Sequence, residues 1–262
     1  MTQVNFTRLW DQLLGEGKST ITPAELQERT GASDAAVYMA AKYAMDRGRL
    51  FSPVRGLYVI VPAEHRGRGV VPATHFVDPM MRHLDADYYI AVASAAQWWG
   101  AAHQAPQEFQ VVTTRRVHDR QIERVRLRFY VTATIDSDAV RRVAGPRTMI
   151  KVATPNLCAV DLASRPAIGG GLSNVATILI ELPDLDGTEI ARLATRRSRS
   201  TARRLGWLLE MARPDLDLAA LRDVALPENG APTLLAPRGS RRGRHDEQWN
   251  VVVNATVEPD DL

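Results

Sequence analysis

The chain has 262 residues, of which 45% are hydrophobic and 24% are charged, and its formal net charge is +3 at pH 7. These proportions are those of a soluble globular protein, and the length is sufficient for two domains with separate cores. A single cysteine excludes an internal disulfide and a cysteine-based zinc cluster, which fits a reducing compartment.

The first residues, MTQVNFTRLWDQLL, lack the basic start and the uninterrupted apolar stretch of a signal peptide. No later run approaches the length of a membrane span. We therefore expect a cytoplasmic protein that does not act at a membrane.

Residues 19–62 have the pattern of a winged helix-turn-helix. Thr22-Pro23-Ala24-Glu25 combines a hydroxyl cap, a proline at the first helical position and a carboxylate three residues after the cap, which predicts a helix start. Thr30-Gly31-Ala32 supplies a turn of helix-turn-helix length, and Ser33 can cap the next helix, from about Asp34 to Asp46. Two β-prone runs around a turn then predict a wing, with strands at 49–52 and 57–61 and the turn at 53–56.

The second helix of this pattern has two different faces. Its apolar face consists of residues that recur at helical spacing, Val37, Ala41, Ala44 and Met45. Its opposite face carries Ala35, Tyr38, Met39 and Lys42. An arginine on the turn of the wing is placed to contact a phosphate. We predict that the helix enters the major groove of DNA and that the contacts come from Ser33, Asp34, Ala35, Tyr38, Lys42 and Arg55.

This region is only slightly basic for a DNA-binding domain. Residues 1–72 hold nine Arg or Lys against seven Asp or Glu, so a single copy should bind weakly, and dimeric binding to repeated half-sites is favoured. Asp34 can either accept a hydrogen bond from a cytosine amino group or cap its helix. A helical cluster with a hairpin can also be a dimerisation or protein-docking module, and this alternative stays open.

A second domain is predicted after a linker. Prolines, glycines and charges mark residues 63–72 as the linker, which separates a domain at 1–62 from a domain at 73–262. In the second domain, strand composition occurs at 109–114, 127–132, 147–153 and 248–257, and helical patterns occur at 75–84, 92–99, 155–163, 172–181, 187–194 and 201–212. The predicted fold is therefore mixed α/β: an N-terminal winged helix-turn-helix followed by a mixed α/β domain.

Arginines gather in three runs. Six arginines and two acids lie within residues 115–128, six arginines and no acid within 192–204, and four arginines within 238–244. Such runs are commonly solvated faces, but three of them beside a DNA-binding module predict that at least one contacts phosphates or an acidic partner. The candidates for these contacts are Arg115, Arg116, Arg196, Arg197 and Arg199.

No motif for catalysis or cofactor binding stands out. Gly169-Gly170-Gly171 lacks the lysine and hydroxyl of a P-loop and is expected to be a flexible loop. The six histidines lack a metal-binding spacing, and Cys158 has apolar neighbours typical of a buried thiol. We predict no catalytic residue, no metal and no cofactor. A nuclease would need clustered carboxylates beside a lysine, and only Lys151 is available after residue 42.

Several phrases occur in an order that is typical of one family. They are RGLYV at 55–59, ASAAQWWGA at 93–101, AP at 105–106 leading into FQVVT at 109–113, TPNLCAVDL at 154–162 and RLGWLLE at 204–210. In this order, after a winged helix, they resemble the AbiEi antitoxins, which are also described as transcriptional regulators of abortive phage-infection systems. The resemblance covers residues 6–212.

The resemblance implies a protein of a bacterial type IV toxin–antitoxin system with a role in phage defence. Its N-terminal domain would repress its own operon by binding inverted repeats in double-stranded promoter DNA. Its C-terminal domain would counter a nucleotidyltransferase-like toxin without forming a stable complex, and the protein would not be an enzyme. The alternative is a stand-alone winged-helix transcription factor whose second domain senses a ligand or a partner.

Overall fold

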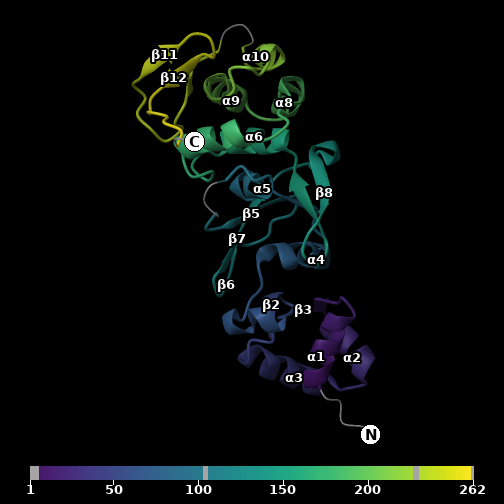
Figure 1. The fold of residues 1–262 in the computed structure, drawn as a ribbon. Helices are drawn as coiled ribbons and strands as arrows, with labels where there is room; N and C mark the ends of the chain where they lie inside the picture. Colours follow the sequence, from purple (N-terminus) through teal and green to yellow (C-terminus); the bar gives the residue numbers. More distant parts are fainter. Residues whose placement is uncertain (1–5, 103–105, 227–229, 261–262) are drawn as a thin grey trace. The chain divides into compact units, whose positions relative to one another are not determined.

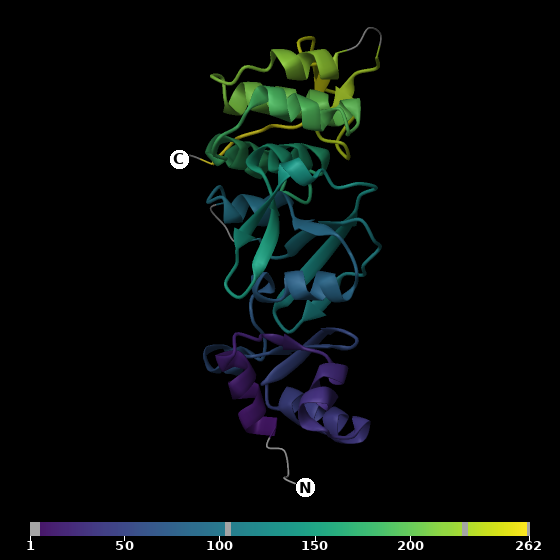
Figure 2. The same ribbon diagram turned by 90° about the vertical axis from the view of Figure 1, so that its right-hand side faces the viewer.

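The computed structural model describes residues 6–102, 106–226 and 230–260. Helical and sheet segments occur along the whole described chain (Figures 1 and 2). The mixed α/β class predicted from the sequence is confirmed.

Residues 6–62, here called the N-terminal module, combine helices with a small antiparallel sheet (Figure 1). The element order is α1 (Phe6–Gly15), β1 (Thr20–Ile21), α2 (Pro23–Thr30), α3 (Asp34–Asp46), β2 (Leu50–Val54) and β3 (Leu57–Ile60), and the sheet order is β1-β3-β2. The helices and strands bury a common core that includes Trp10, Leu13, Leu26, Val37 and Leu50. Burial of one large apolar side chain contributes about 1.5–3 kcal/mol, so this core holds the helices on the sheet.

A six-stranded sheet follows in the chain, with the strand order β6-β7-β5-β4-β9-β8. Its strands are β4 (Tyr88–Ile90), β5 (Phe109–Thr113), β6 (Arg120–Ile122), β7 (Val125–Val131), β8 (Val140–Ala144) and β9 (Met149–Ala153). Strand β7 pairs in parallel with β5 and antiparallel with β6, and β4 pairs in parallel with β9. The segments that precede the sheet are η1 (Ala63–Arg68), η2 (Ala73–His75) and α4 (Val77–His83).

The C-terminal part of the chain is mainly helical. Its helices are α5 (Val92–Trp98), η3 (Ser137–Ala139), α6 (Pro155–Ser164), α7 (Leu172–Glu181), α8 (Gly187–Ala194), α9 (Arg199–Ala212) and α10 (Ala219–Ala225). Helix α6 packs against α5, α8 and α9, and α10 packs against α8 and α9. The last three strands, β10 (Thr233–Leu234), β11 (Arg244–Asp246) and β12 (Val251–Val253), form a separate sheet in the order β10-β12-β11.

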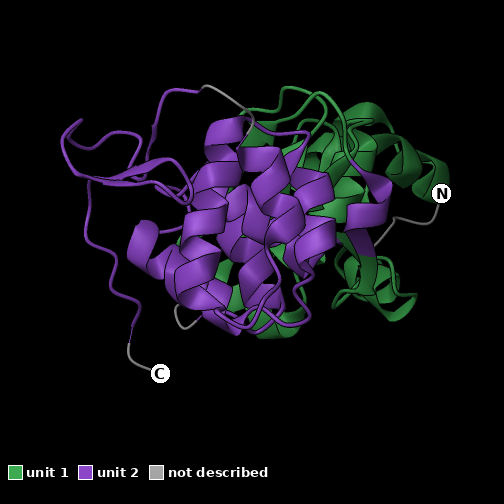
Figure 3. Cartoon of the chain, turned by 90° about the horizontal axis from the view of Figure 1, so that it is seen from above, with its two compact units in different colours: residues 1–89, 107–135, 142–151 green, residues 90–106, 136–141, 152–262 purple. Residues whose placement is uncertain are grey.

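The chain divides into two compact units (Figure 3). Unit 1 contains residues 1–89, 107–135 and 142–151, and unit 2 contains residues 90–106, 136–141 and 152–262. The N-terminal module, α4, β5, β6 and β7 belong to unit 1, whereas α5, α6 to α10 and the small C-terminal sheet belong to unit 2. The division into 1–62, 63–72 and 73–262 stays a prediction.

Some boundaries differ from those that the sequence predicts. The strand expected at 248–257 is reduced to β12, because Asn250 has a φ of +50° and the Trp249 N–H turns back to Asp246 Oδ1 at 3.0 Å. The turn of the β2–β3 hairpin contains only Arg55 and Gly56, since Val54 pairs with Leu57. The elements that the sequence did not reveal include α1, β1, β4, β6, η3, β8, α10, β10 and β11. Most of these are too short for a periodic pattern of their own.

Gly206 shows how the end of the chain is anchored on α9. A Cβ at this position would lie 2.1 Å from a ring atom of Trp249, so the contact requires a glycine. The Trp249 ring is fully buried, and its indole N–H donates to Glu210 Oε2 at 2.7 Å. The contact therefore fixes the segment between β11 and β12 on α9.

Candidate nucleic-acid interface

Helix α3 begins and ends as its sequence predicts. Gly31 ends α2 in a left-handed conformation with φ +64°, and Ser33 caps α3 by accepting a hydrogen bond from the Ala36 N–H at 3.4 Å. Val37, Ala41 and Ala44 are buried in the core of the module, and Met45 packs against it. The apolar face predicted for this helix is confirmed, so its other face is turned away from the core.

The outer face of α3 exposes large apolar side chains. Tyr38, Met39 and Tyr43 are 61%, 60% and 56% exposed. Lys42 lies between them in the sequence, is exposed, and forms no ion pair with any acid that the structure describes. Ala35 lies on the same face and is also exposed. An exposed helical surface of this composition is suited to contact another molecule.

Tyr43 and Arg47 extend this surface, and neither is among the contacts predicted from the sequence. The Arg47 guanidinium carbon lies 3.6 Å from the centroid of the Tyr43 ring, a cation–π contact. Tyr43 is eight residues after Ala35, so extending the helical periodicity of the outer face would have found it. Arg47 follows the last residue of the helix and adds a second cation to that end.

Asp34 and Arg55 are exposed like the rest of the predicted set, but each also contacts a neighbouring element. Asp34 accepts a hydrogen bond from Gln27 Nε2, which ties the start of α3 to α2. Arg55 lies on the β2–β3 turn, its carbonyl oxygen is 3.0 Å from His83 Nε2 of α4, and its side chain is exposed. The structure thus collects Asp34, Ala35, Tyr38 and Lys42 on α3, with Ser33 as its N-cap, and places Arg55 on a separate element.

Acidic side chains neutralise several cations of the N-terminal module. Lys18 pairs with Glu25 at 2.6 Å and Arg29 with Glu16 at 2.8 Å. Burial would raise the pKa of Glu25, but hydrogen bonds from Lys18 and Thr22 outweigh that effect and hold it below its usual value. Both pairs involve residues outside α3, and neither Lys42 nor Arg47 forms an ion pair with a described acid.

The arginine run at 115–128 is divided between structural and open positions. Arg115 Nη1 donates to the carbonyl oxygens of Leu84 and Asp85 at 3.0 and 2.9 Å and pairs with the Asp85 carboxylate at 3.3 Å, so it binds the segment that follows α4. Arg128 pairs with Glu108 and Asp119. Arg116 is exposed and has no ion pair within the described ranges.

The run at 192–204 is largely used inside unit 2. Arg196 pairs with Asp136 at 3.4 Å, and Arg197 pairs at 3.0 Å with Asp161, whose side chain is fully buried. Arg204 is 5% exposed and donates to three backbone carbonyls, those of Leu235, Ala163 and Leu234, at 2.8, 2.9 and 3.1 Å. Arg199, in the first turn of α9, is exposed and has no ion-pair partner in the described chain.

The run at 238–244 is the most open of the three. Its arginines are all exposed, and none of them forms an ion pair or a hydrogen bond through its side chain to a described residue. The members are Arg238, Arg241, Arg242 and Arg244. This run was noted in the sequence but was not chosen as a contact, because composition does not show which arginines have partners.

Lys151, the lysine considered for a nuclease, and the buried Asp78 both have structural partners. Lys151 Nζ pairs with Asp87 at 2.5 Å, and the buried Asp78 is bound by Arg82 and by the Tyr88 hydroxyl at 3.1 Å. Among the described residues, no group of three or more His, Cys, Asp or Glu is arranged to hold a metal ion. None of the helices that can be described is long and apolar enough to cross a membrane.

Cys158 is fully buried, and its Sγ lies 3.2 Å from the Val92 carbonyl oxygen. Burial raises the pKa of its thiol well above the usual value. The expectation of a buried thiol is therefore confirmed. His103, one of the six histidines, and Ala105 of the family phrases lie outside the described residues.

The fold is that of a protein in which an α/β domain follows a helical module with a small sheet. Residues 89–211 match the family model of the AbiEi antitoxin C-terminal domain. This match confirms the resemblance predicted from the sequence and supports an antitoxin role.

A solved structure has a similar fold. It is described as the crystal structure of the RV2827C protein from Mycobacterium tuberculosis, and it is 18% identical with a TM-score of 0.70. The similarity covers 94% of this chain and 89% of that chain, so the fold is shared over nearly the whole length. Among curated proteins, no match to this chain is found.

Proposed function

We propose that this protein is an antitoxin that binds the promoter of its own operon through α3. The observation that carries the proposal is the outer face of α3, where Tyr38, Met39 and Tyr43 are exposed around Lys42. The order of helices and strands in the N-terminal module supports its assignment as a winged helix-turn-helix, in which the second helix of the motif enters the major groove. The β2–β3 hairpin is the wing.

The chemistry of α3 fits a groove that is read by both hydrogen bonds and apolar contacts. Apolar side chains recognise the methyl group of thymine, a tyrosine hydroxyl can bond to base edges or phosphates, and lysine neutralises a phosphate. Asp34 is the exception, since a carboxylate repels phosphates, and its hydrogen bond with Gln27 supports a role at the start of the helix.

Binding as a dimer to inverted repeats follows from the modest charge of the module. A few cations per copy provide limited phosphate neutralisation, and two copies on two half-sites combine their contributions. Repression results when the bound dimer excludes the transcription machinery from the promoter. The protein acts by binding and needs no catalytic residue.

The second part of the proposal concerns the toxin. The AbiEi antitoxin C-terminal domain at residues 89–211 supports a toxin partner in general, and we propose that this partner is nucleotidyltransferase-like and is countered without a stable complex. Co-expression tests this directly: cells that carry the neighbouring toxin gene should grow only when the antitoxin is present, and a purification tag on either protein should not retain the other. Continued arrest would contradict the toxin assignment.

The first experiment for the DNA proposal is a mobility-shift titration on the DNA upstream of the gene and on a scrambled duplex, at two salt concentrations. We expect preferential binding that weakens steeply as salt rises. Equal or absent binding would overturn the proposal and would favour protein docking by the same apolar face. Met39→Ala should reduce the preference, whereas Met211→Ala, at another exposed methionine, is the matched control.

We also propose that the chain is organised as a DNA-binding domain at 1–62, a linker at 63–72 and a mixed α/β domain at 73–262. Expression of residues 73–262 alone should give a protein with a cooperative thermal transition. A fragment that is soluble only in denaturant would contradict this division, and it would indicate that the N-terminal module contributes to the stability of unit 1.

A further inference from the structure

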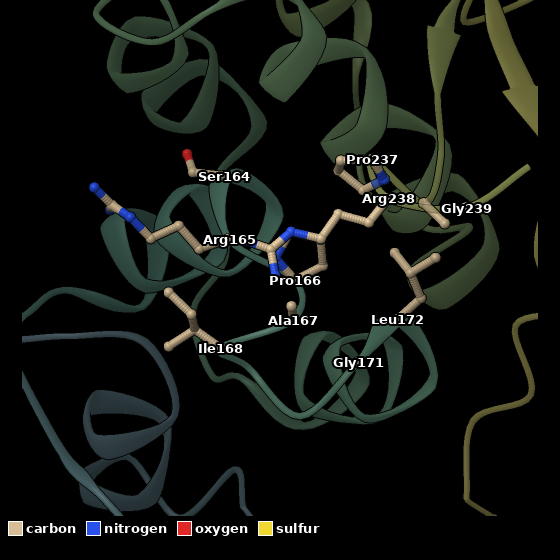
Figure 4. Close-up of a pocket in the computed structure, with 11 residues that line it drawn as sticks. Ser164, Arg165, Pro166, Ala167, Ile168, Gly171, Leu172, Pro237, Arg238 and Gly239 are labelled. Atoms are coloured by element: carbon tan, nitrogen blue, oxygen red, sulfur yellow. The ribbon is translucent and has the colours of Figure 1, made fainter. Parts of the chain in front are cut away.

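Unit 2 contains a cavity of about 550 Å³ (Figure 4). One wall is the segment that connects α6 to α7, with lining residues between Ser164 and Leu172, and the other wall is the segment 236–239 that follows β10. The volume lies in the range of about 300–1,000 Å³ that is typical of small-molecule sites. The second wall lies beyond residue 211, so it is not part of the segment that matches the antitoxin family.

The lining is apolar with a positive rim. The apolar part of the surface comes from Pro166, Ala167, Ile168, Leu172, Ala236 and Pro237. Arg165 and Arg238 also line the cavity, and no acidic side chain is among its lining residues. In Figure 4 the Arg238 side chain extends from its own loop towards the side of the cavity that carries Pro166. Its guanidinium has no carboxylate or carbonyl partner in the described residues.

Buried hydrogen bonds hold the two walls together. Arg204 donates to the Ala163 carbonyl, next to Ser164 of one wall, and to the Leu235 carbonyl, next to Ala236 of the other. Because its side chain is almost completely buried, Arg204 fixes the spacing between the walls from behind the cavity.

The loop that carries Arg238 is also fixed. Asn254 accepts from the Ala236 N–H at 2.8 Å and donates to the carbonyl oxygens of Ala236 and Ser240 at 3.0 and 2.6 Å. A Cβ on Gly239 would lie 2.9 Å from the Asn254 amide nitrogen, so the loop packs closely against this side chain. The backbone of the loop that carries Arg238 is therefore held in place before any ligand binds, which lowers the entropic cost of binding.

We propose that this cavity binds a small organic anion, in which an apolar or aromatic group carries a carboxylate or a phosphate. The apolar wall covers the hydrophobic part of the ligand, and Arg238 forms charge-assisted hydrogen bonds with its anionic group. The exposed arginines that follow, Arg241 and Arg242, raise the local positive potential and attract the anion to the rim. The site is independent of α3 and of DNA binding.

The test is a fluorescence titration of the full-length protein with 8-anilinonaphthalene-1-sulfonate, whose anilinonaphthalene group carries one anion. We expect saturable binding of one molecule per chain. Arg238→Gln should weaken it by about tenfold or more, since one hydrogen bond to a charged group is lost. Arg241→Gln, in the same loop but outside the lining, is the matched control and should change the affinity by less than about threefold.

Two further experiments distinguish the contribution of the anionic group to binding from that of the apolar surface. N-phenyl-1-naphthylamine has the same rings without the sulfonate, and we expect it to bind more weakly and to be insensitive to Arg238→Gln. Equal binding of both probes, or equal loss in the Arg238 and Arg241 variants, would overturn the assignment of an anion site. Displacement of the charged probe by phenyl phosphate or by benzoate then shows which anionic group the site prefers.

A variant that fills the cavity controls for binding of the probe elsewhere on the protein. Ala167→Trp should abolish binding of the charged probe while the far-ultraviolet circular dichroism spectrum and the mobility shift on DNA stay unchanged. Full binding in this variant would place the probe elsewhere on the protein and would contradict the proposal.

Discussion

The arginine runs at 192–204 and 238–244 look alike in the sequence but occupy different environments in the structure. In the first, Arg204 is buried with three carbonyl acceptors and Arg197 neutralises the buried Asp161. In the second, every guanidinium is exposed without a partner among the described residues. A run of cations therefore indicates a binding surface only when its arginines have no ion-pair or hydrogen-bond partners inside the protein.

The difference arises from where each run lies in the fold. Residues 199–212 form α9, which packs against α6, α7, α8 and α10, so arginines on its inner side must find acceptors within the protein. Residues 235–243 form a loop between two short strands that carries Arg238, Arg241 and Arg242. Arg244 begins β11, and all four side chains are exposed. Buried guanidinium groups with acceptors contribute to stability, and exposed ones remain accessible to other molecules.

Arg204→Ala is expected to have the largest effect on this comparison. It removes the guanidinium that donates to three carbonyl oxygens, and it opens a cavity behind the pocket. The free energy of unfolding should therefore fall by about 4 kcal/mol. Urea denaturation followed by circular dichroism measures this loss. Arg244→Ala is the matched exposed control, and its effect should stay within about 0.5 kcal/mol; a similar loss in both variants would contradict the distinction.

Arg197→Ala should cause the next largest loss of unfolding free energy. It removes a cation that pairs with the fully buried Asp161 carboxylate at 3.0 Å, which costs about 3 kcal/mol of unfolding free energy. Arg199→Ala, two residues away and exposed, should be nearly neutral in the same urea titration. Arg197→Met combined with Asp161→Leu should recover much of the loss, because a buried ion pair can be replaced by apolar packing. Failure of this rescue would assign Arg197 another role.

The N-terminal module extends the comparison to DNA binding. Lys42 lies on the outer face of α3, whereas the backbone of Arg55 contacts His83. Lys42→Ala should weaken binding to all duplexes and reduce the slope of log affinity against log salt by about one unit. Arg55→Ala should do the same if the wing reaches a phosphate. A normal slope for either variant would remove that side chain from the interface.

Local signals in the sequence were sufficient for much of the fold. Helices α3, α7 and α8 have the predicted bounds because caps and apolar periodicity are encoded within a few residues. The partners of Arg204 lie between 30 and 41 residues away in the sequence, and no local pattern identifies them. The exposed face of α3 was predicted, but the stacking of Arg47 on Tyr43 depends on side-chain geometry after the helix ends.

A smaller effect on stability is expected from His75, whose charged form is disfavoured by its surroundings, in contrast to the buried guanidinium of Arg204. Arg204 is buried with acceptors for its donors, whereas His75 is partly buried beside His65 and Arg147, and its Nδ1 has no partner in the described structure. Burial, and then the nearby charges of His65 and Arg147, lower the pKa of His75 below its ordinary value of 6.5. The folded protein therefore keeps this imidazole neutral where the unfolded chain would be protonated.

Stability should consequently fall as the pH is lowered through 6.5, because in that range the unfolded chain binds a proton that the folded protein does not. The fall should end once the pH passes below the folded pKa, since both states are then protonated. Thermal denaturation between pH 8 and pH 5 measures it, with His75→Gln as the variant and His118→Gln, at an exposed histidine, as the control. The His75 variant should show a flatter pH dependence than the wild type, and equal slopes in all three proteins would show that protonation of His75 does not limit stability.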